Sequence, residues 1–423
     1  MCEINNLAPQ IVIVTVGSAG DLFPFLRVGV ELAARGLRIA FLAPGVFAEQ
    51  VAAAGLPFHP LPVDEQVLRD PHLWHPRKGF NVVWQATRPA MQEFVRFVDA
   101  LPEDEPAAII AHPLALADAD LCRAARPRMH IIAAYLAPSN LRTMHGAMHM
   151  GPLPIPAWTP AWLRRWLWNT ADRSVLAPAA LPGINAARSR RALAPVASFM
   201  DHMESIADQS LLLFPSWFAP TQPDWPQPCV EGDFALYDPL GMPALGDELQ
   251  AFLAAGDAPI VFTHGTGNRQ AQTYFRHAIA ATGKLGRRAI LLTPERDQLP
   301  AALPPNILWQ DYVPLRALLP HVAALSHHGG IGTTAEALRA GIPQLIVPMA
   351  FDQFDNAARV QTLGAGLGLP AARTTVFTLT SRLKTLLASP TIQAACKAAQ
   401  AHFEGESRLV RAIDEIQISI SKT

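Results

Sequence analysis

The first residues of the chain alternate short β-branched apolar runs with stretches of helical periodicity. The run "QIVIVTV" (10–16) ends at a glycine, and the helical pattern "FLRVGVELAARG" follows it. A second apolar run, "LRIAFLAP" (37–44), comes next. This order of strand, turn, helix and strand is typical of the start of a parallel α/β sheet.

The same pattern recurs along the rest of the chain. Further buried strands are predicted at 107–112, 130–136, 209–215, 259–265, 288–294, 306–314, 323–330 and 343–349. Between the third and fourth of these, "SWFAPTQPDWPQP" has too many prolines for a regular element. The simplest architecture is an α/β fold of two successive Rossmann-like halves, whose shared cleft is the default ligand site.

Length and composition agree with two domains. A chain of 423 residues exceeds the size at which a single core stops growing, and half of its residues are apolar. We expect an N-terminal Rossmann-like domain, a proline-rich linker, a C-terminal Rossmann-like domain and a helical tail. Their expected ranges are 1–217, 218–245, 246–395 and 396–423.

Charge and cysteine usage narrow the class of protein. The formal net charge of −1 argues against a general nucleic-acid binder, which needs a basic face. Four scattered cysteines form no CxxC pair, so we expect reduced thiols and no zinc site. No apolar run reaches the roughly 20 residues that span a bilayer. The start of the chain lacks the basic-then-apolar order of a secretory signal. We therefore expect a cytoplasmic protein.

A glycine-rich turn follows the strand predicted at 323–330. Gly330 and Gly332 let the backbone come close to a bulky ligand. We expect a helix to start at Thr333, with its free N–H groups facing outward, as suits a diphosphate. His328 adds a further donor. On its own the turn is equally compatible with tight strand-to-helix packing and histidines that are merely structural.

An acid–amide pair, Asp352 and Gln353, follows the next predicted strand. Its oxygens are able to hold sugar hydroxyls, although loop capping is the commoner role for such a pair. The same expected sheet edge carries Gly265, Thr266, Tyr312 and Val313.

Read from His328, the pattern "HxGxGTxxEALxAGxPxxxxPxxxDQxxNA" resembles the donor signature of nucleotide-sugar glycosyltransferases with the two-Rossmann (GT-B) fold. That resemblance implies a nucleoside diphosphate sugar as co-substrate, with no metal and no further cofactor. It also implies roles by position. The acceptor would bind in the N-terminal domain and the nucleotide sugar in the C-terminal domain. The residues that would hold the diphosphate are His328, Gly330, Gly332 and Thr333. Glu336 would bind the ribose, Asp352 and Gln353 would bind the sugar, and Tyr312 and the backbone of Val313 would border the base.

The turn "GSAGDLFPF" follows the first strand and carries Asp21 and Ser18, of which Ser18 is a candidate to bind the acceptor. Many GT-B enzymes have a histidine base in this turn, and the antibiotic- and sterol-glycosylating branches resemble this chain in having aspartate. A carboxylate there can accept the proton of an acceptor hydroxyl, and burial can raise its low pKa. Asp21 is equally suited to cap the following helix, and the two roles are compatible. His112, at another strand end, is a candidate to orient Asp21 or the substrate.

Over nearly the whole chain, segments such as "DPHLWHPRKGF" and "WFAPTQPDWPQP" also resemble the rhamnosyltransferases of rhamnolipid synthesis. The resemblance to those enzymes implies dTDP-rhamnose as donor and a 3-hydroxyacyl lipid as acceptor. The polar turn around His328 is closer to the pattern of glycosyltransferases that use UDP-glucose or act on glycopeptides. The resemblance therefore leaves glucose, rhamnose or another hexose open.

The expected acceptor side is rich in methionine and tryptophan. Met144, Met148 and Trp74 are candidates to line an apolar groove for an acyl chain. Arg164 and Arg165 lie among four tryptophans, a composition seen in helices on membrane surfaces. An ordinary core helix with snorkelling arginines is the commoner explanation, and contact with the inner membrane is the alternative.

We therefore expect an inverting glycosyltransferase acting on a hydroxyl of an apolar, lipid-like or other small hydrophobic acceptor. A nucleotide-sugar 2-epimerase shares the fold but needs no apolar acceptor groove. A non-catalytic partner that only binds a nucleotide sugar or lipid is the rival of another class. A dinucleotide oxidoreductase fits least, because "GSAGD" lacks the full GxGxxG spacing.

Overall fold

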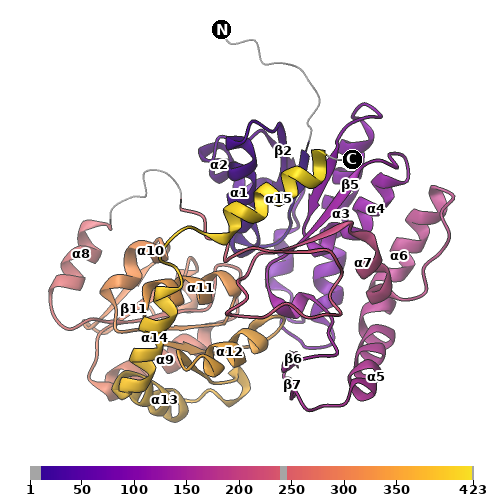
Figure 1. Cartoon of the computed structure of the whole chain (residues 1–423). Helices are drawn as coiled ribbons and strands as arrows, with labels where there is room; N and C mark the ends of the chain where they lie inside the picture. Colours follow the sequence, from indigo (N-terminus) through magenta and orange to yellow (C-terminus); the bar gives the residue numbers. More distant parts are fainter. Residues whose placement is uncertain (1–10, 239–244, 422–423) are drawn as a thin grey trace, which may run out of the picture.

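The computed structural model describes residues 11–238 and 245–421, which form two α/β domains side by side (Figure 1). Each is built on one parallel sheet whose strands are almost wholly buried, because helices cover both faces. A two-stranded hairpin, β6 and β7, lies outside both sheets.

The N-terminal sheet has seven parallel strands in the order β3-β2-β1-β4-β5-β8-β9. Its strands and the hairpin are β1 (Ile11–Val14), β2 (Ile39–Pro44), β3 (Phe58–Leu61), β4 (Ala108–Ala111), β5 (His130–Tyr135), β6 (Met148–Met150), β7 (Leu153–Ile155), β8 (Gln209–Leu212) and β9 (Cys229–Glu231). The helices are α1 (Ala19–Ala34), α2 (Ala48–Ala53), α3 (Gly79–Asp99), α4 (Leu116–Arg123), α5 (Ala161–Ala171), α6 (Ala177–Arg190) and α7 (Phe199–Ile206).

The C-terminal sheet has six parallel strands in the order β12-β11-β10-β13-β14-β15. Its strands are β10 (Ile260–Thr263), β11 (Ala289–Leu292), β12 (Ile307–Gln310), β13 (Ala324–His327), β14 (Gln344–Ile346) and β15 (Gly366–Gly368). The helices are α8 (Asp247–Ala254), α9 (Gln272–Leu285), α10 (Leu315–Leu318), α11 (Ile331–Ala340), α12 (Gln353–Thr362), α13 (Val376–Ala388), α14 (Pro390–Ala401) and α15 (Arg408–Ser421).

Both sheets share the Rossmann order, in which the first strand lies between the second and the fourth. The direction of winding reverses between β1 and β4 in one domain and between β10 and β13 in the other. Ligands of open α/β sheets bind at such a reversal, outside the carboxyl ends of the two strands. The topology therefore predicts one subsite per domain.

Two boundaries differ from the expected ones. Strand β9 pairs with β8 and so belongs to the N-terminal sheet, although it lies within the expected linker 218–245. A three-residue strand after a run of prolines is too short to show periodicity. Helix α14 already begins at Pro390, before the expected tail. Residues 239–244 of that linker and 1–10 of the N-terminal domain lie outside the described residues.

The chain ends by returning to the domain in which it began. Helix α15 packs against α1 and β9 of the N-terminal domain (Figure 1). Its buried residues, Leu409, Ile413 and Ile416, recur at helical spacing and join the N-terminal core. Nε of Arg35 also donates to Asp414 Oδ1 at 2.7 Å. The tail thus ties the two domains together.

Candidate active site

The carboxyl ends of β1 and β4 bring together the two predicted catalytic residues. Asp21 lies in the first turn of α1, directly after β1, and His112 follows β4. Nε2 of His112 lies 3.6 Å from Oδ1 of Asp21. The reversal point of the sheet therefore juxtaposes a carboxylate and an imidazole.

Asp21 uses its two oxygens differently. Oδ2 accepts hydrogen bonds from the Ser18 N–H at 2.7 Å and the Ser18 hydroxyl at 3.1 Å, which completes a capping box on α1. A Cβ on Gly17 would come 2.3 Å from Oδ2, so glycine is needed for this turn. Oδ1 is the oxygen that faces His112. The capping role expected as an alternative is present, and it leaves one oxygen for a substrate.

The tautomer of His112 follows from its other nitrogen. Nδ1 accepts a hydrogen bond from the Leu114 N–H at 3.2 Å, so the neutral ring carries its proton on Nε2. The protonated nitrogen lies 3.6 Å from Asp21 Oδ1, just beyond hydrogen-bond distance. His112 is therefore arranged to hold the carboxylate in place, and Asp21 is the member of the pair that can accept a proton.

In the C-terminal domain, the ends of β10 and β13 also meet. The ring of His328, after β13, lies against Gly265, after β10. A Cβ on Gly265 would come 2.8 Å from Cε1 of this ring, and a Cβ on Gly330 would come 2.6 Å from its Nε2. Both glycines are thus needed for His328 to fit between the two loops.

Helix α11 begins earlier than expected. It starts at Ile331, with Gly330 as N-cap, so Thr333 lies within its first turn and is not its first residue. The hydroxyl of Thr334 donates to Gly330 O at 3.0 Å and is occupied within the helix. The helix still presents its positive end and first N–H groups beside His328, as a diphosphate requires.

Three histidines, His264, His327 and His328, lie close together next to the glycine-rich turn. Burial lowers the pKa of His264 and of His327 to about 3, and that of His328 to about 4. Nε2 of His327 bonds Gln344 at 2.9 Å, whereas Nδ1 of His328 is buried without a partner. At neutral pH His328 is therefore uncharged, and a ligand is free to bond it.

Asp352 and Asn356 form a second group at this edge. The Asn356 amide, on α12, donates to Asp352 Oδ2 at 2.7 Å and to Gly329 O at 2.9 Å. It joins the predicted sugar site to the glycine turn. Asn356 is the asparagine of the pattern read from His328, and the sequence analysis assigned it no role. Burial and the facing charge of Asp21 raise the pKa of Asp352 to about 7, whereas the Asn356 bond opposes the shift. The two carboxyl groups, which belong to different domains, therefore lie close enough for the charge of Asp21 to act on Asp352.

The side chain of Gln353 serves the loop before it. Its Oε1 accepts from the backbone N–H groups of Met349 at 2.8 Å and Ala350 at 3.2 Å. Loop capping, the alternative expected for this pair, therefore occupies the oxygen of Gln353. Asp352 makes no such cap and keeps a carboxylate oxygen for a ligand.

The remaining predicted donor residues surround the same edge. Glu336 is ion-paired to Arg339 at 2.7 Å, and burial raises the pKa of Glu336. The phenol of Tyr312 lies close enough for the charge of Glu336 to raise its pKa, after burial as the larger cause. Val313 is buried, and Thr266 is exposed. Glu336 must share its carboxylate with Arg339 if it also binds a ribose.

Comparisons with known proteins match both halves of the chain. Residues 11–113 match the glycosyltransferase family 28 N-terminal domain, and residues 276–406 match the erythromycin biosynthesis protein CIII-like C-terminal domain. A 6-deoxyallosyltransferase acting on O-mycaminosyltylonolide in Streptomyces fradiae is 29% identical over 90% of each chain. Glycosyltransferase GtfE of Amycolatopsis orientalis is also 29% identical, over 90% of this chain and 91% of its own.

Solved structures share the fold. A calicheamicin glycosyltransferase superposes with a TM-score of 0.68 at 19% identity, covering 98% of this chain and 99% of its own. Glycosyltransferase VinC, solved in complex with dTDP, gives 0.64 at 19% identity over 98% and 100%. The chain is a GT-B glycosyltransferase. None of these four proteins is named for rhamnolipid synthesis. The matches therefore support the glycosyltransferase family and not the predicted resemblance to rhamnosyltransferases of rhamnolipid synthesis.

The residues predicted to bind the acceptor are spread more widely over this glycosyltransferase than those predicted to bind the donor. Trp74 stacks edge-on against Phe351 of the C-terminal domain, with ring centroids 5.8 Å apart, next to Asp352. Phe351 has a left-handed φ of 54°, which is strained for an aromatic residue. Met148 is buried in the hairpin, whose neighbour His149 donates its N–H to Asp355 of α12 at 3.2 Å. These contacts connect the predicted acceptor and donor halves.

Met144 is not part of an apolar groove. It lines a hollow of about 310 Å³ in the N-terminal domain, with Arg142, Arg165, Asn169, Asp201, Glu204 and Asp224 around it. Its backbone N–H donates to Asp224 at 2.6 Å. The expectation of an apolar contact at Met144 is wrong for this conformation, because the loop is held by carboxylates.

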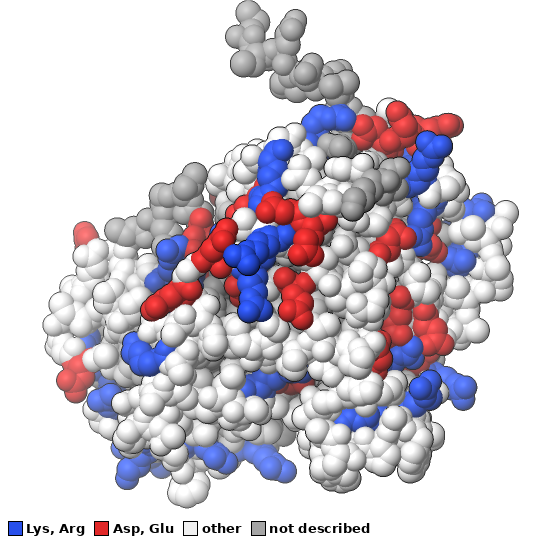
Figure 2. Space-filling model, viewed as in Figure 1, with Lys and Arg blue, Asp and Glu red and all other residues white. Residues whose placement is uncertain are grey.

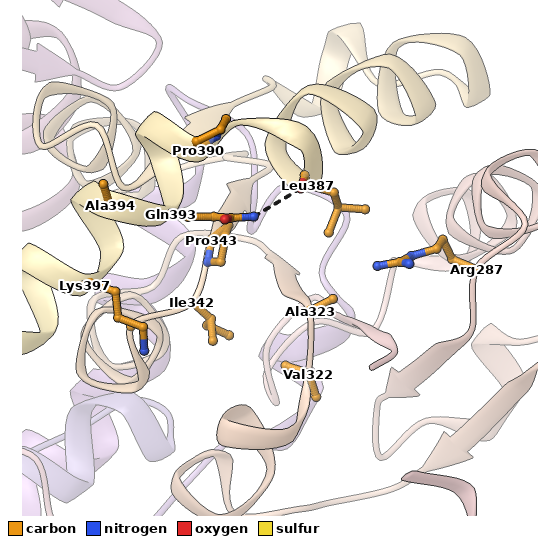
Figure 3. Close-up of a pocket in the computed structure, with 11 residues that line it drawn as sticks. Arg287, Val322, Ala323, Ile342, Pro343, Leu387, Pro390, Gln393, Ala394 and Lys397 are labelled. Carbon is orange, nitrogen blue, oxygen red and sulfur yellow. Dashed lines mark hydrogen bonds between the residues drawn. The ribbon is translucent and has the colours of Figure 1, made fainter. Parts of the chain in front are cut away.

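A larger hollow, of about 550 Å³, lies in the C-terminal domain (Figure 3). Its lining includes Ala323 and Pro343, which immediately precede β13 and β14. It therefore lies at the amino edge of the sheet, away from the predicted donor residues. In the described part of the chain, no cluster of three or more acidic, histidine or cysteine side chains is arranged to hold a metal.

Proposed function

We propose that this glycosyltransferase inverts the anomeric centre as it transfers a hexosyl or 6-deoxyhexosyl group from a nucleoside diphosphate donor to a hydroxyl of an apolar, lipid-like acceptor. The observation that carries the proposal is the pairing of Asp21 with His112, 3.6 Å apart at the sheet end of the N-terminal domain, close enough to Asp352 of the other domain for the charge of Asp21 to raise the pKa of Asp352. A base on one side and a sugar-binding carboxylate on the other leave the anomeric carbon between them.

In the proposed step, the acceptor oxygen attacks the anomeric carbon from the Asp21 side. Oδ1 of Asp21 takes the hydroxyl proton, while the N–H of His112 keeps the carboxylate oriented. The bond between the anomeric carbon and the diphosphate breaks, and its electron pair leaves with the diphosphate. The N-terminus of α11 and His328 would stabilise that charge, as preorganised donors do.

The donor nucleotide is a uridine or deoxythymidine diphosphate in this proposal. The relative VinC was solved with dTDP, and the sequence pattern around His328 is similar to that of UDP-glucose enzymes. UDP-glucose and dTDP-L-rhamnose are the two donors to try first. Trp74, Phe351 and the hairpin supply apolar surface beside the sugar site, which supports a hydrophobic acceptor. We also propose peripheral contact with a membrane, where such acceptors reside.

The test is product formation with purified protein, UDP-glucose or dTDP-L-rhamnose, and a short 3-hydroxyacyl acceptor. Product with one donor is expected from the native chain and not from Asp21→Asn, while calorimetry shows that the variant still binds the nucleotide. Retained product with Asp21→Asn would exclude Asp21 as the base. A 2-epimerase would instead convert the free nucleotide sugar without an acceptor.

A further inference from the structure

Helix α5 carries large aromatic side chains on the outside of the molecule. Trp158, just before it, is 81% exposed, and Trp162 and Trp166 are 70% and 58% exposed. Trp162 and Trp166 are four residues apart and share one helix face. Leu153 of the adjacent hairpin is also 48% exposed. Together we call these four residues the tryptophan face.

Of the two arginines beside these tryptophans, Arg164 is buried. Arg164 is only 1% exposed and donates from its guanidinium to the carbonyls of Thr159 at 3.0 Å, Gly146 at 2.6 Å and Pro156 at 2.6 Å. It fixes the start of α5 to the loops on either side of the hairpin. A core helix with snorkelling arginines, the commoner expectation for this segment, is therefore wrong. The tryptophan face is held rigidly outward.

The segment around the face is strongly basic. Between positions 141 and 200 the sequence has seven arginines and a single acidic residue, Asp172, which is buried. Arg164 bonds backbone carbonyls, and Arg142, Arg188 and Arg191 are ion-paired to acidic residues. The other three arginines are exposed and have no ion pair among the described residues: Arg165, Arg173 and Arg190.

Arg165 and Arg173 continue the exposed side of the helix. Arg165 directly precedes Trp166, and Arg173 lies two residues beyond the end of α5. The hollow beside Arg165 also contains Asp201 and Glu204, whose charges are engaged with Arg142. In Figure 2 the tip of the domain that carries α5 and the hairpin is mostly white, with blue side chains next to it.

We propose that the tryptophan face, with Arg165 and Arg173, docks on an anionic phospholipid surface. Tryptophan favours the boundary between headgroups and acyl chains, and arginine is attracted to acidic headgroups. An exposed apolar patch with a basic border matches an acidic lipid surface, and the basic border is local because the net charge of the whole chain is −1. Among the described helices, none is long and apolar enough to cross a membrane.

Docking there would bring the reaction site to the lipid. The hairpin next to the face contacts α12 through His149 and Asp355, one turn away from Asp352 (Figure 1). An acceptor leaving the bilayer at the tryptophan face would therefore reach the interface between the domains over the hairpin. This part of the inference rests on the proposed apolar acceptor, whereas the docking itself does not.

The test is sedimentation of the full chain with vesicles of phosphatidylcholine, with or without phosphatidylglycerol. The Trp162→Ala/Trp166→Ala variant is expected to bind the acidic vesicles at least about tenfold more weakly, because binding scales with buried apolar area. Phe377→Ala removes an aromatic residue that is 77% exposed on α13, in the other domain, and should bind as the native chain does. The Arg165→Glu/Arg173→Glu variant should lose its preference for acidic vesicles.

Equal sedimentation of the tryptophan variant and the Phe377→Ala control would overturn the proposal, as would no sedimentation of the native chain. Self-association of the native protein without lipid, lost in the tryptophan variant, would assign the face to a protein contact instead. Transfer to a short, water-soluble acceptor should be unchanged in the tryptophan variant. Vesicle binding without any transfer activity would refute the proposed function and leave the docking surface standing.

Discussion

Oδ1 of Asp21 lies 3.6 Å from Nε2 of His112, and the second nitrogen of that ring accepts a backbone N–H. The ring therefore presents a proton to the carboxylate and cannot itself take one from a substrate at Nε2. This geometry supports the proposed roles of Asp21 as base and of His112 as its positioning residue.

Replacing Asp21 by Asn should lower kcat by about 10²–10⁴-fold, the range expected for loss of a general base. The new amide oxygen can still accept from the Ser18 N–H, so the cap and the melting temperature should change little. Kinetics and thermal unfolding of the same preparation check both points. Ser18→Ala is the matched control: it weakens the cap by about 0.5–2 kcal/mol and should leave most of the activity.

His112→Ala should lower activity less than Asp21→Asn does, because the base is still present but less well oriented. A larger loss at His112 than at Asp21 would contradict the assigned roles. Since both residues belong to one unit, the double variant should be little worse than Asp21→Asn alone. A full set of kcat/KM values for the three variants decides this.

Gly332→Ala should separate stability from donor binding. A Cβ at this position meets no atom within 4 Å, and alanine favours a helix over glycine by up to about 1 kcal/mol. The variant should therefore be as stable as the native protein or more stable, yet bind a nucleoside diphosphate more weakly because the methyl group fills space beside the helix end. Unchanged nucleotide affinity by calorimetry would place the diphosphate elsewhere.

Gly330→Ala is expected to behave differently, since its Cβ would come 2.6 Å from Nε2 of His328 and displace that ring. Both stability and nucleotide affinity should fall. Adding His328→Ala should restore the stability and not the affinity, which thermal unfolding with and without nucleotide will show.

Asp352 should make stability and donor binding depend on pH in opposite directions. Its pKa is raised from 3.8 to about 7, so the folded state favours the protonated acid. The stability from this group is fully present below the unfolded pKa and is lost as pH rises through 7. Asp352→Asn should thus melt higher than the native protein at pH 8, with the difference shrinking toward pH 5.

If the ionised carboxylate accepts sugar hydroxyls, native affinity for the donor should rise as pH passes through 7. Asp352→Asn should abolish that rise, and Asp21→Asn should move it to lower pH because one facing charge is removed. A pH-independent donor affinity in the native chain would remove Asp352 from the sugar site.

Asn356→Ala should destabilise the C-terminal domain by about 1–3 kcal/mol, because it leaves the buried Gly329 carbonyl and Asp352 without their shared donor. Donor affinity should fall as well, since Asn356 sets the distance between the glycine turn and the sugar site. Urea unfolding gives the first quantity and calorimetry the second. Thr362→Ala on the same helix serves as control for stability, since Thr362 is exposed and its hydroxyl donates to Ala358 O within the helix.

The sequence by itself indicated the parallel α/β class and most of the strands of the two parallel sheets, although not β3, β9 or β15. Short β-branched runs separated by helical periods are typical of a parallel sheet, and the carboxyl ends of such strands meet at one edge. Asp21, His112, Gly265 and His328 were thus placed at strand ends from local pattern alone, whereas the reversal points came from the strand order in the structure. The motif from His328 added the family.

Only the tertiary structure showed which side chains contact each other across the chain. The bonds of Asn356 and the return of α15 to the N-terminal domain join segments far apart in the chain, and no local period encodes them. In α5, leucines and tryptophans occupy both sides of the helix, so periodicity could not tell which side is buried. The bonds of Arg164 settle that choice, because a buried guanidinium must satisfy its donors and so turns the tryptophans outward.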